Sequence, residues 1–160
     1  PMNAPLCRPD SLDMPLIYQL RNMNAQDLAR YPCCTEGLEN RILEAAQKNI
    51  TRETLLQQVK TRRYPYTRLS RLLTQVLLHM DEALLQRNPS PEYVRLLGFR
   101  KEAKHLLSLL KNSPFPHVSK AADGNLSSDL YQLDIRAYDL WALGAELPAG
   151  LMFRQKMVTI

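Results

Sequence analysis

Residues 67–86 read TRLSRLLTQVLLHMDEALLQ, and this stretch carries the clearest periodic pattern in the chain. Apolar side chains recur every three or four positions, at Leu69, Leu72, Leu73, Val76, Leu77, Met80 and Leu84. At about 100° per residue, this spacing forms one apolar stripe along a helix. Arg68, Arg71, Gln75 and His79 keep the same spacing on a neighbouring polar stripe. We therefore predict one long helix from about Thr67 to Gln86, which anchors in a core and presents two arginines outward.

Helical patterns also flank this stretch on both sides. The chain has 5 Gly and 11 Pro, and the prolines fall mostly between the patterns, where they act as breaks. Residues 14–30 suit one or two short helices, split near Asn24, and Thr35 and Thr51 are suited to cap the next two. The predicted helices span 15–22, 25–30, 37–49, 52–60, 91–99, 100–111 and 127–144 in addition to the long one.

These patterns predict a mainly α fold, a single helical bundle of about six to seven helices. One short strand pair can be added, because HVSK at 117–120 suits a short strand and the chain end suits either an edge strand or irregular structure. We expect a Pro-rich tail or linker remnant at 1–13, one helical domain at 14–147 and a C-terminal tail at 148–160. A chain that starts with Pro1 suggests a fragment or a processed protein.

No apolar run approaches the roughly 20 residues that a membrane span needs, and no leader opens the chain. We therefore expect a cytoplasmic protein with no membrane partner. The three cysteines include an adjacent pair without CxxC spacing, which favours reduced thiols over a metal or redox site.

Positive charge is concentrated in one window. The chain holds 21 Lys and Arg against 16 Asp and Glu, but residues 54–80 contain five basic side chains and no acidic one. The remaining 16 basic side chains balance the 16 acidic ones, so the whole excess lies in this window. Such a local excess points to a polyanionic partner.

No complete active-site motif is present. The sequence lacks GxxxxGK[ST], GxGxxG, HExxH and GxSxG, and its three histidines are too scattered to suggest metal ligands. Asp134 and Asp139 are five residues apart on a predicted helix, so we expect them to form structural ion pairs rather than an acid/base couple.

The central part of this window, KTRRYPYTRLSRLL at 60–73, is the candidate site. Guanidinium groups fork onto phosphates and tyrosine rings stack on unpaired bases, so the stretch suits an RNA surface. A solvated helix face explains the charges equally well, and the tyrosines could instead pack over the helix start as a hydrophobic staple. A membrane-surface helix is less favoured, since the apolar stripe is needed for the core. The candidate RNA-binding residues are Lys60, Arg62, Arg63, Tyr64, Tyr66, Arg68 and Arg71.

Four motifs occur in an order and spacing that resemble a known family. They are GLENRI at 37–42, KTRRYPYTRLSRLL at 60–73, YVRLLGF at 93–99 and LDIRAYDLWAL at 133–143. Over roughly Leu16 to Gly144 the chain resembles the C-terminal half of bacterial tRNA(Met) cytidine acetate ligases, which are grouped with predicted nucleotidyltransferases of the HIGH superfamily. The second motif is long enough to be specific.

The resemblance implies an ATP-dependent ligase that forms N4-acetylcytidine at the wobble position of elongator tRNA(Met). ATP with Mg and acetate are then expected for the parent enzyme and no cofactor for this chain. On this basis we expect a tRNA-binding helical C-terminal domain that is not catalytic alone. Its partners are tRNA and an N-terminal nucleotidyltransferase domain of the same parent chain. The resemblance also covers Arg41, Arg95 and Arg136, which could equally be structural ion-pair partners.

Two other functions stay open. The chain could be a structural domain whose basic stripe docks on the nucleotidyltransferase domain, with little RNA affinity of its own. It could also belong to an enzyme that uses a different nucleotide or substrate.

Overall fold

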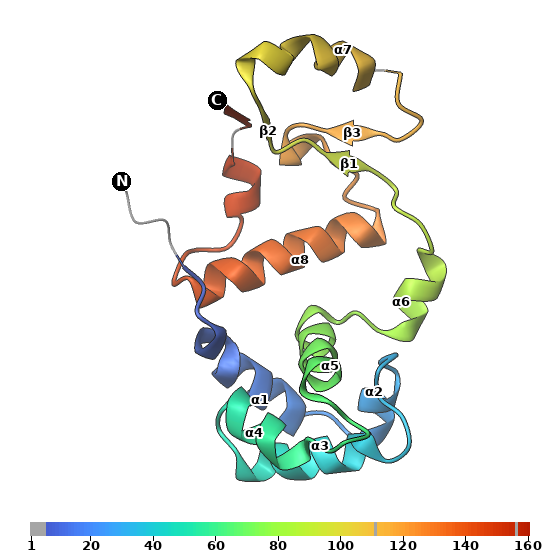
Figure 1. Ribbon diagram of the computed structural model, residues 1–160, viewed down its shortest axis with the longest axis vertical. Helices are drawn as coiled ribbons and strands as arrows, with labels where there is room; N and C mark the ends of the chain where they lie inside the picture. Colours follow the sequence, from blue (N-terminus) through green and yellow to red (C-terminus); the bar gives the residue numbers. More distant parts are fainter. Residues whose placement is uncertain (1–5, 111, 156) are drawn as a thin grey trace.

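The computed structural model describes residues 6–110, 112–155 and 157–160. Five helices form the lower half of the molecule in Figure 1, which we call the helical body. They are α1 (Asp13–Arg21), α2 (Ala25–Ala29), α3 (Leu38–Lys48), α4 (Arg52–Val59) and α5 (Tyr66–Leu78).

The helical body has one continuous apolar core. Helix α5 supplies Leu69, Leu72, Leu73 and Val76 to this core, as its stripe predicts, and every one of these side chains is buried. Helices α1, α2, α3 and α4 contribute Leu16, Ile17, Leu20, Leu28, Leu38, Ile42, Ala45, Ala46, Leu55, Leu56 and Val59. Because the core draws side chains from all five helices, it fixes the surface that α5 and the preceding loop present.

The helix boundaries in this half follow local capping. The Asn24 side chain accepts a hydrogen bond from the backbone amide of Asp27, and the Asp27 carboxylate accepts one from the backbone amide of Asn24, which is a capping box. Thr51 Oγ1 accepts from the backbone nitrogen of Thr54, so its predicted role as the cap of α4 is confirmed. Thr35 does not cap α3, because the N-cap is Gly37 in the left-handed conformation, with φ 80°.

The single helix predicted over 67–86 is wrong in its second half. Helix α5 ends at Leu78, His79 takes a left-handed conformation with φ 53°, and a short helix α6 (Glu82–Arg87) follows. The amide of Met80 donates to the carbonyl of Gln75, and the amide of His79 donates to that of Val76, which closes α5 as a Schellman turn. Asp81 then caps α6 by accepting from the backbone of Leu84 at 2.8 Å.

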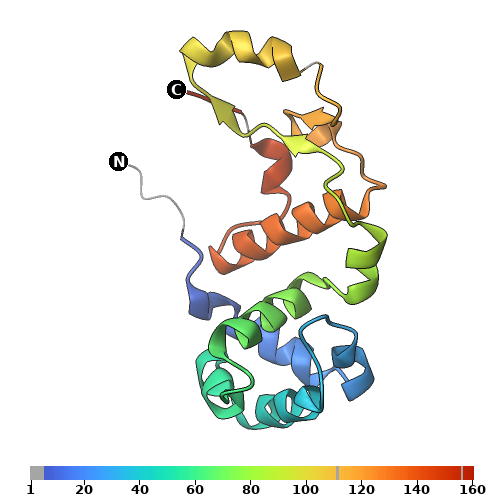
Figure 2. The same cartoon turned by 45° about the vertical axis from the view of Figure 1, so that its right-hand side comes forward.

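Residues 92–160, which we call the α8 region, are built on helix α8 (Asp129–Gly144). Figure 1 and Figure 2 show this helix between the helical body and a layer of short strands. Two parallel strand pairs are present, β1 (Val94–Arg95) with β3 (His117–Val118) and β2 (Gly98–Phe99) with β4 (Val158–Thr159). The short helical segments are η2 (Lys101–Leu106), α7 (Leu107–Leu110), η3 (Ala121–Asp123) and η4 (Leu151–Arg154).

Several predictions for this region are corrected. The mainly α class and the helix at 127–144 are confirmed, and the strand at 117–118 and the edge strand at the chain end exist. The helix expected over 91–99 is wrong, because these residues supply β1 and β2. The single bundle is also wrong, because the α8 region has its own small core of Val118, Ala121, Tyr131 and Met152.

Part of the expected N-terminal tail is a short helical segment. Residues 1–5 lie outside the described residues, while η1 (Pro9–Leu12) is a turn of 3-10 helix that packs against α8 and leads directly into α1. A Cβ added to Gly144 would lie 2.3 Å from Cys7 Sγ, so this close approach needs glycine in α8.

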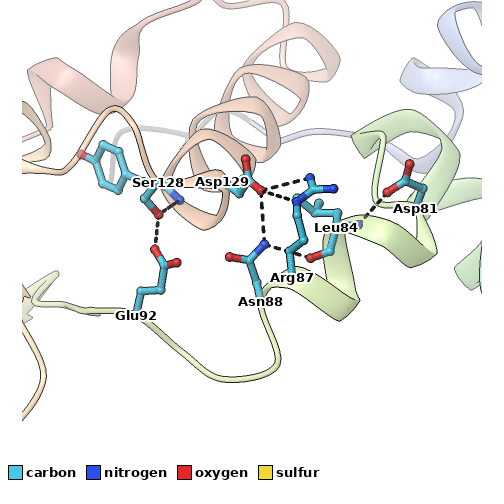
Figure 3. Close-up of polar contacts among 8 residues, drawn as sticks. Asp81, Leu84, Arg87, Asn88, Glu92, Ser128 and Asp129 are labelled. Carbon is cyan, nitrogen blue, oxygen red and sulfur yellow. Dashed lines mark hydrogen bonds and ion pairs between the residues drawn. The ribbon is translucent and has the colours of Figure 1, made fainter.

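Polar contacts hold α6 and the residues that follow it to the start of α8, as Figure 3 shows. Arg87 donates to Asp129 Oδ2 from Nε at 3.2 Å and from Nη2 at 3.1 Å, and Asn88 donates to the same oxygen at 3.4 Å. Ser128 caps α8 by accepting from the backbone of Tyr131, and its hydroxyl donates to Glu92. These bonds set the position of α8 relative to α6. In the part of the chain that the structure describes, no helix is long and apolar enough to cross a membrane.

Candidate nucleic-acid interface

Residues 60–65 form the tight connection between α4 and α5. The amide of Tyr64 donates to Thr61 Oγ1 at 3.1 Å, and the amide of Thr61 donates to the carbonyl of Tyr64 at 3.2 Å. This closed turn leaves the side chains of Lys60, Arg62 and Arg63 exposed. The loop therefore concentrates three cations at the start of α5.

Tyr64 is part of the core and is not presented to a ligand. Its side chain is 4% exposed, and its hydroxyl donates to the carbonyl of Thr35 at 3.2 Å. The prediction that this ring stacks on a base is therefore not met, and the alternative, a packing role at the start of the helix, fits the geometry.

Arg68 also serves the fold. Its Nε donates to the carbonyl of Cys33 at 3.3 Å and its Nη2 to Thr35 Oγ1 at 2.9 Å, while its guanidinium lies 5.4 Å from the centre of the Tyr64 ring. The side chain ties α5 to the turn before α3. Two of its donor groups, Nε and Nη2, are thus engaged inside the protein.

Arg63 and Tyr66 have partners but keep exposed surface. Arg63 forms an ion pair with Glu36, and its side chain is still 65% exposed. Tyr66 donates from its hydroxyl to Glu53 Oε2 at 3.0 Å, and this hydrogen bond raises the pKa of Tyr66. The ring of Tyr66 remains about one third exposed.

Lys60, Arg62 and Arg71 are the cations left without a partner. All three are exposed, and among the described residues none of the three side chains makes an ion pair or a hydrogen bond. Arg71 lies one turn beyond Thr67 on the exposed side of α5. We call Lys60, Arg62, Arg63 and Arg71 the basic surface.

Two further arginines of the four motifs, Arg41 and Arg95, have partners within the protein. Arg41 donates to the carbonyl of Val59 at 3.1 Å. Arg95 pairs with Asp134 at 3.0 Å, and the hydroxyl of Tyr93 donates to the same carboxylate at 3.1 Å. Asp139 accepts from the backbone of Gly150 at 2.8 Å. The expected structural ion pair is present at Asp134, whereas among the described residues Asp139 makes a hydrogen bond to the backbone and no ion pair.

Arg136 differs from these arginines. Its Nε is buried, and in the described part of the chain it has no hydrogen-bond partner.

Metal ligands are not gathered in the described ranges. No group of three or more His, Cys, Asp or Glu side chains there could hold a metal ion. Of the cysteines, Cys34 is buried, and burial, with Glu39 beside it, raises the pKa of its thiol to about 12. All three cysteines are free thiols.

Comparison with known proteins gives the family. The model described as HIGH Nucleotidyl Transferase matches residues 2–152. The chain belongs to this family. A tRNA(Met) cytidine acetate ligase of Acetivibrio thermocellus is 36% identical over 152 residues, which cover 87% of this chain and 37% of that protein. The protein of the same name from Bacillus subtilis is 32% identical over 149 residues, covering 91% of this chain and 35% of the relative.

The chain thus spans little more than a third of the length of these relatives. The fold is shared with a solved structure, the crystal structure of Thermotoga maritima TmcAL bound with alpha-thio ATP. The TM-score is 0.81 at 20% sequence identity, over 94% of this chain and 42% of that chain.

The family match corrects the functional expectation. The matched model is that of the nucleotidyl transferases, and it covers residues 2–152. Nearly the whole chain therefore aligns with nucleotidyltransferase sequence. The prediction of a C-terminal tRNA-binding domain, or a docking domain, from which the nucleotidyltransferase part is absent is therefore wrong. The expectation that ATP concerns only a separate N-terminal domain of the parent chain is overturned with it.

Proposed function

We propose that this chain works in an ATP-dependent ligase of the nucleotidyltransferase family that acetylates a cytidine of tRNA(Met), and that the basic surface contacts the tRNA backbone. ATP and acetate are the co-substrates in this proposal, with elongator tRNA(Met) as the expected acceptor. The names of the relatives support the reaction class. The observation that carries the tRNA contact is the set of three exposed and unpaired cations, Lys60, Arg62 and Arg71.

Charge and geometry agree in this assignment. Phosphate groups are recognised by exposed guanidinium and ammonium groups, and the energy comes from release of counterions. An arginine whose guanidinium already donates to protein acceptors contributes less to phosphate binding. Arg68 is therefore a positioning residue for α5 in this proposal. Tyr66 is the one candidate tyrosine with exposed ring surface, and it can contact a base only from its outer face.

The proposal is tested by two assays that use the same substitutions. The first measures binding of labelled tRNA(Met) by fluorescence anisotropy to the wild-type chain and to the variants Arg62→Ala and Arg71→Ala. We expect each variant to bind several-fold more weakly while its circular dichroism is unchanged. Lys104→Ala is the matched control, since it removes one exposed cation outside the basic surface and should bind like the wild type.

The second assay measures ATP-dependent transfer of labelled acetate to tRNA(Met) by the full-length protein with the same substitutions. Activity should fall with tRNA affinity in Arg62→Ala and Arg71→Ala and stay unchanged in Lys104→Ala. Equal tRNA affinity in all four proteins would overturn the assignment of the basic surface. No acetate transfer by the unsubstituted protein would overturn the reaction class.

A further inference from the structure

A groove of about 710 Å³ lies where α1 meets α2 and the residue that follows α5. Its lining includes Tyr18, Gln19 and Asn22 from α1 and its C-terminal end, Tyr31 after α2, and His79. None of these residues belongs to the basic surface. Pockets that hold small ligands enclose about 300–1,000 Å³, so the groove has room for a nucleoside.

Two side-chain amides of the groove are oriented by backbone carbonyls. Gln19 Nε2 donates to the carbonyl of Val76 at 2.8 Å, and Asn22 Nδ2 donates to the carbonyl of Tyr18 at 2.7 Å. Because a carbonyl can only accept, the nitrogen of each amide must face it. The two amide oxygens are then left as acceptors, and the described residues offer neither of them a donor.

The remaining polar groups of the groove are largely occupied. Asp27 accepts from the backbone of Asn24 with one carboxylate oxygen and pairs with Arg30 at 2.7 Å through the other. The ring Nε2 of His79 lies 3.5 Å from the Gln19 amide nitrogen. The groove therefore presents two oriented acceptors, at Gln19 and Asn22, on the α1 side, while Arg30 and Tyr31 supply donors elsewhere in its lining.

An aromatic ring stands beside these acceptors without a packing role. Tyr18 is 72% exposed, although it lies on α1 between the buried residues Ile17 and Leu20. Asn22 follows four residues later, so both side chains lie on the same side of α1. Exposed aromatic rings next to polar groups are the usual means by which proteins hold unpaired bases.

We propose that this groove binds an unpaired nucleobase that carries an exocyclic amino group, as cytosine, adenine and guanine do. The base stacks on Tyr18, and its amino group donates to the amide oxygens of Gln19 and Asn22. Uracil presents a carbonyl oxygen where cytosine has its amino group, so it would place an acceptor against two acceptors. This inference rests on the proposed function, since the occupant is an unpaired nucleotide of the bound tRNA.

The experiment compares labelled single-stranded rC6, rA6 and rU6 for binding to the whole chain at one salt concentration. The three oligonucleotides carry the same phosphates, so differences in affinity report on the bases. We expect rC6 and rA6 to bind at least about fivefold more tightly than rU6. Tyr18→Ala should weaken rC6 binding about tenfold through loss of stacking, and Tyr18→Phe should retain it.

Two further variants separate the groove from its surroundings. Gln19→Ala should reduce the preference for rC6 over rU6 while leaving rU6 binding unchanged. Met14→Ala, on the same helix and 81% exposed but outside the groove lining, should behave like the wild type. Circular dichroism of each variant shows whether the fold is kept.

Equal affinity for rC6 and rU6 in the wild type, or unchanged rC6 binding by Tyr18→Ala, would overturn the inference. If tRNA still binds through Arg62 and Arg71 in that case, only the groove assignment fails. If neither tRNA nor oligonucleotides bind, the proposed function fails, and titration with CMP against UMP still decides whether the groove prefers an amino-bearing base.

Discussion

The helical body and the α8 region bury their apolar side chains in different ways. In the helical body, five helices that follow one another in sequence share one core, and α5 alone supplies four fully or nearly fully buried aliphatic side chains. In the α8 region, four buried residues come from β3, η3, α8 and η4. Strands of two residues there pair with partners far along the chain. A local periodic pattern therefore describes the first region and fails for the second.

The largest expected effect is in the shared core of the helical body. Leu72 is completely buried, so Leu72→Ala removes buried methyl groups and leaves a cavity. We expect the free energy of unfolding to fall by about 2–5 kcal/mol, measured by urea denaturation followed by circular dichroism. Thr74→Ala, at an exposed position of the same helix, is the control. A loss for Leu72→Ala no larger than that of the control would contradict the core assignment.

A smaller and more local effect is expected in the α8 region. A Cβ added to Gly98 would lie 2.7 Å from the carbonyl oxygen of Val158, so Gly98→Ala must push β2 and β4 apart. We expect a cost of about 1–3 kcal/mol that stays within this region. Hydrogen exchange should accelerate at the amides of Val158 and Ile160, which donate to Leu97 and Phe99. Faster exchange throughout α1–α5 would show instead that the two regions unfold as one unit.

The helix caps offer a matched pair between the two regions. Ser128 caps α8 and Thr51 caps α4, each by accepting from the backbone amide three residues later. Replacement by alanine should cost about 1 kcal/mol at either position, because capping is a local interaction. The loss at Ser128→Ala should be the larger of the two, since its hydroxyl also donates to Glu92. Chemical denaturation of both variants measures the difference, and a larger loss at Thr51→Ala would refute the ranking.

The smallest effect concerns the contact between the end of α6, which links the two regions, and the start of α8. Hydrogen bonds from Arg87 and Asn88 hold the pKa of Asp129 below its ordinary value of 3.8. A carboxyl group with a lowered pKa in the folded state stabilises the protein above the ordinary value, and this contribution is lost as pH falls through the lowered one. Asp129→Asn should therefore lower the Tm at pH 7 and differ less from the wild type at pH 3. A difference in Tm that does not depend on pH would contradict this role.

The part of the fold that could be predicted from sequence is the part with local causes. The stripe of Leu69, Leu72, Leu73 and Val76 indicated α5, and Thr51 marked the start of α4. The stop at His79 was missed because the apolar spacing continues to Leu84, while the left-handed residue and the cap at Asp81 interrupt the backbone. The strands at 94–99 were missed because their partners are at 117–118 and 158–159, and no local pattern encodes such pairing.

The candidate site, too, could be predicted from sequence only in part. An acid-free window with five cations is visible in the sequence, and it led to Lys60, Arg62 and Arg71, which the structure leaves exposed and unpaired within the described ranges. The roles of Tyr64 and Arg68 could not be predicted, since both depend on Thr35, about thirty residues earlier in the chain. The groove beside Tyr18 was missed because α1, α2 and His79 meet only in the folded chain.

The central claim is that the basic surface binds RNA phosphates, and the most direct test is the salt dependence of tRNA(Met) binding. For the wild-type chain, log affinity should fall linearly with log salt. The double variant Arg62→Ala/Arg71→Ala should bind more weakly, with a slope shallower by about 1.4–1.8 for two lost phosphate contacts. A double variant that keeps the wild-type slope and affinity would contradict the account.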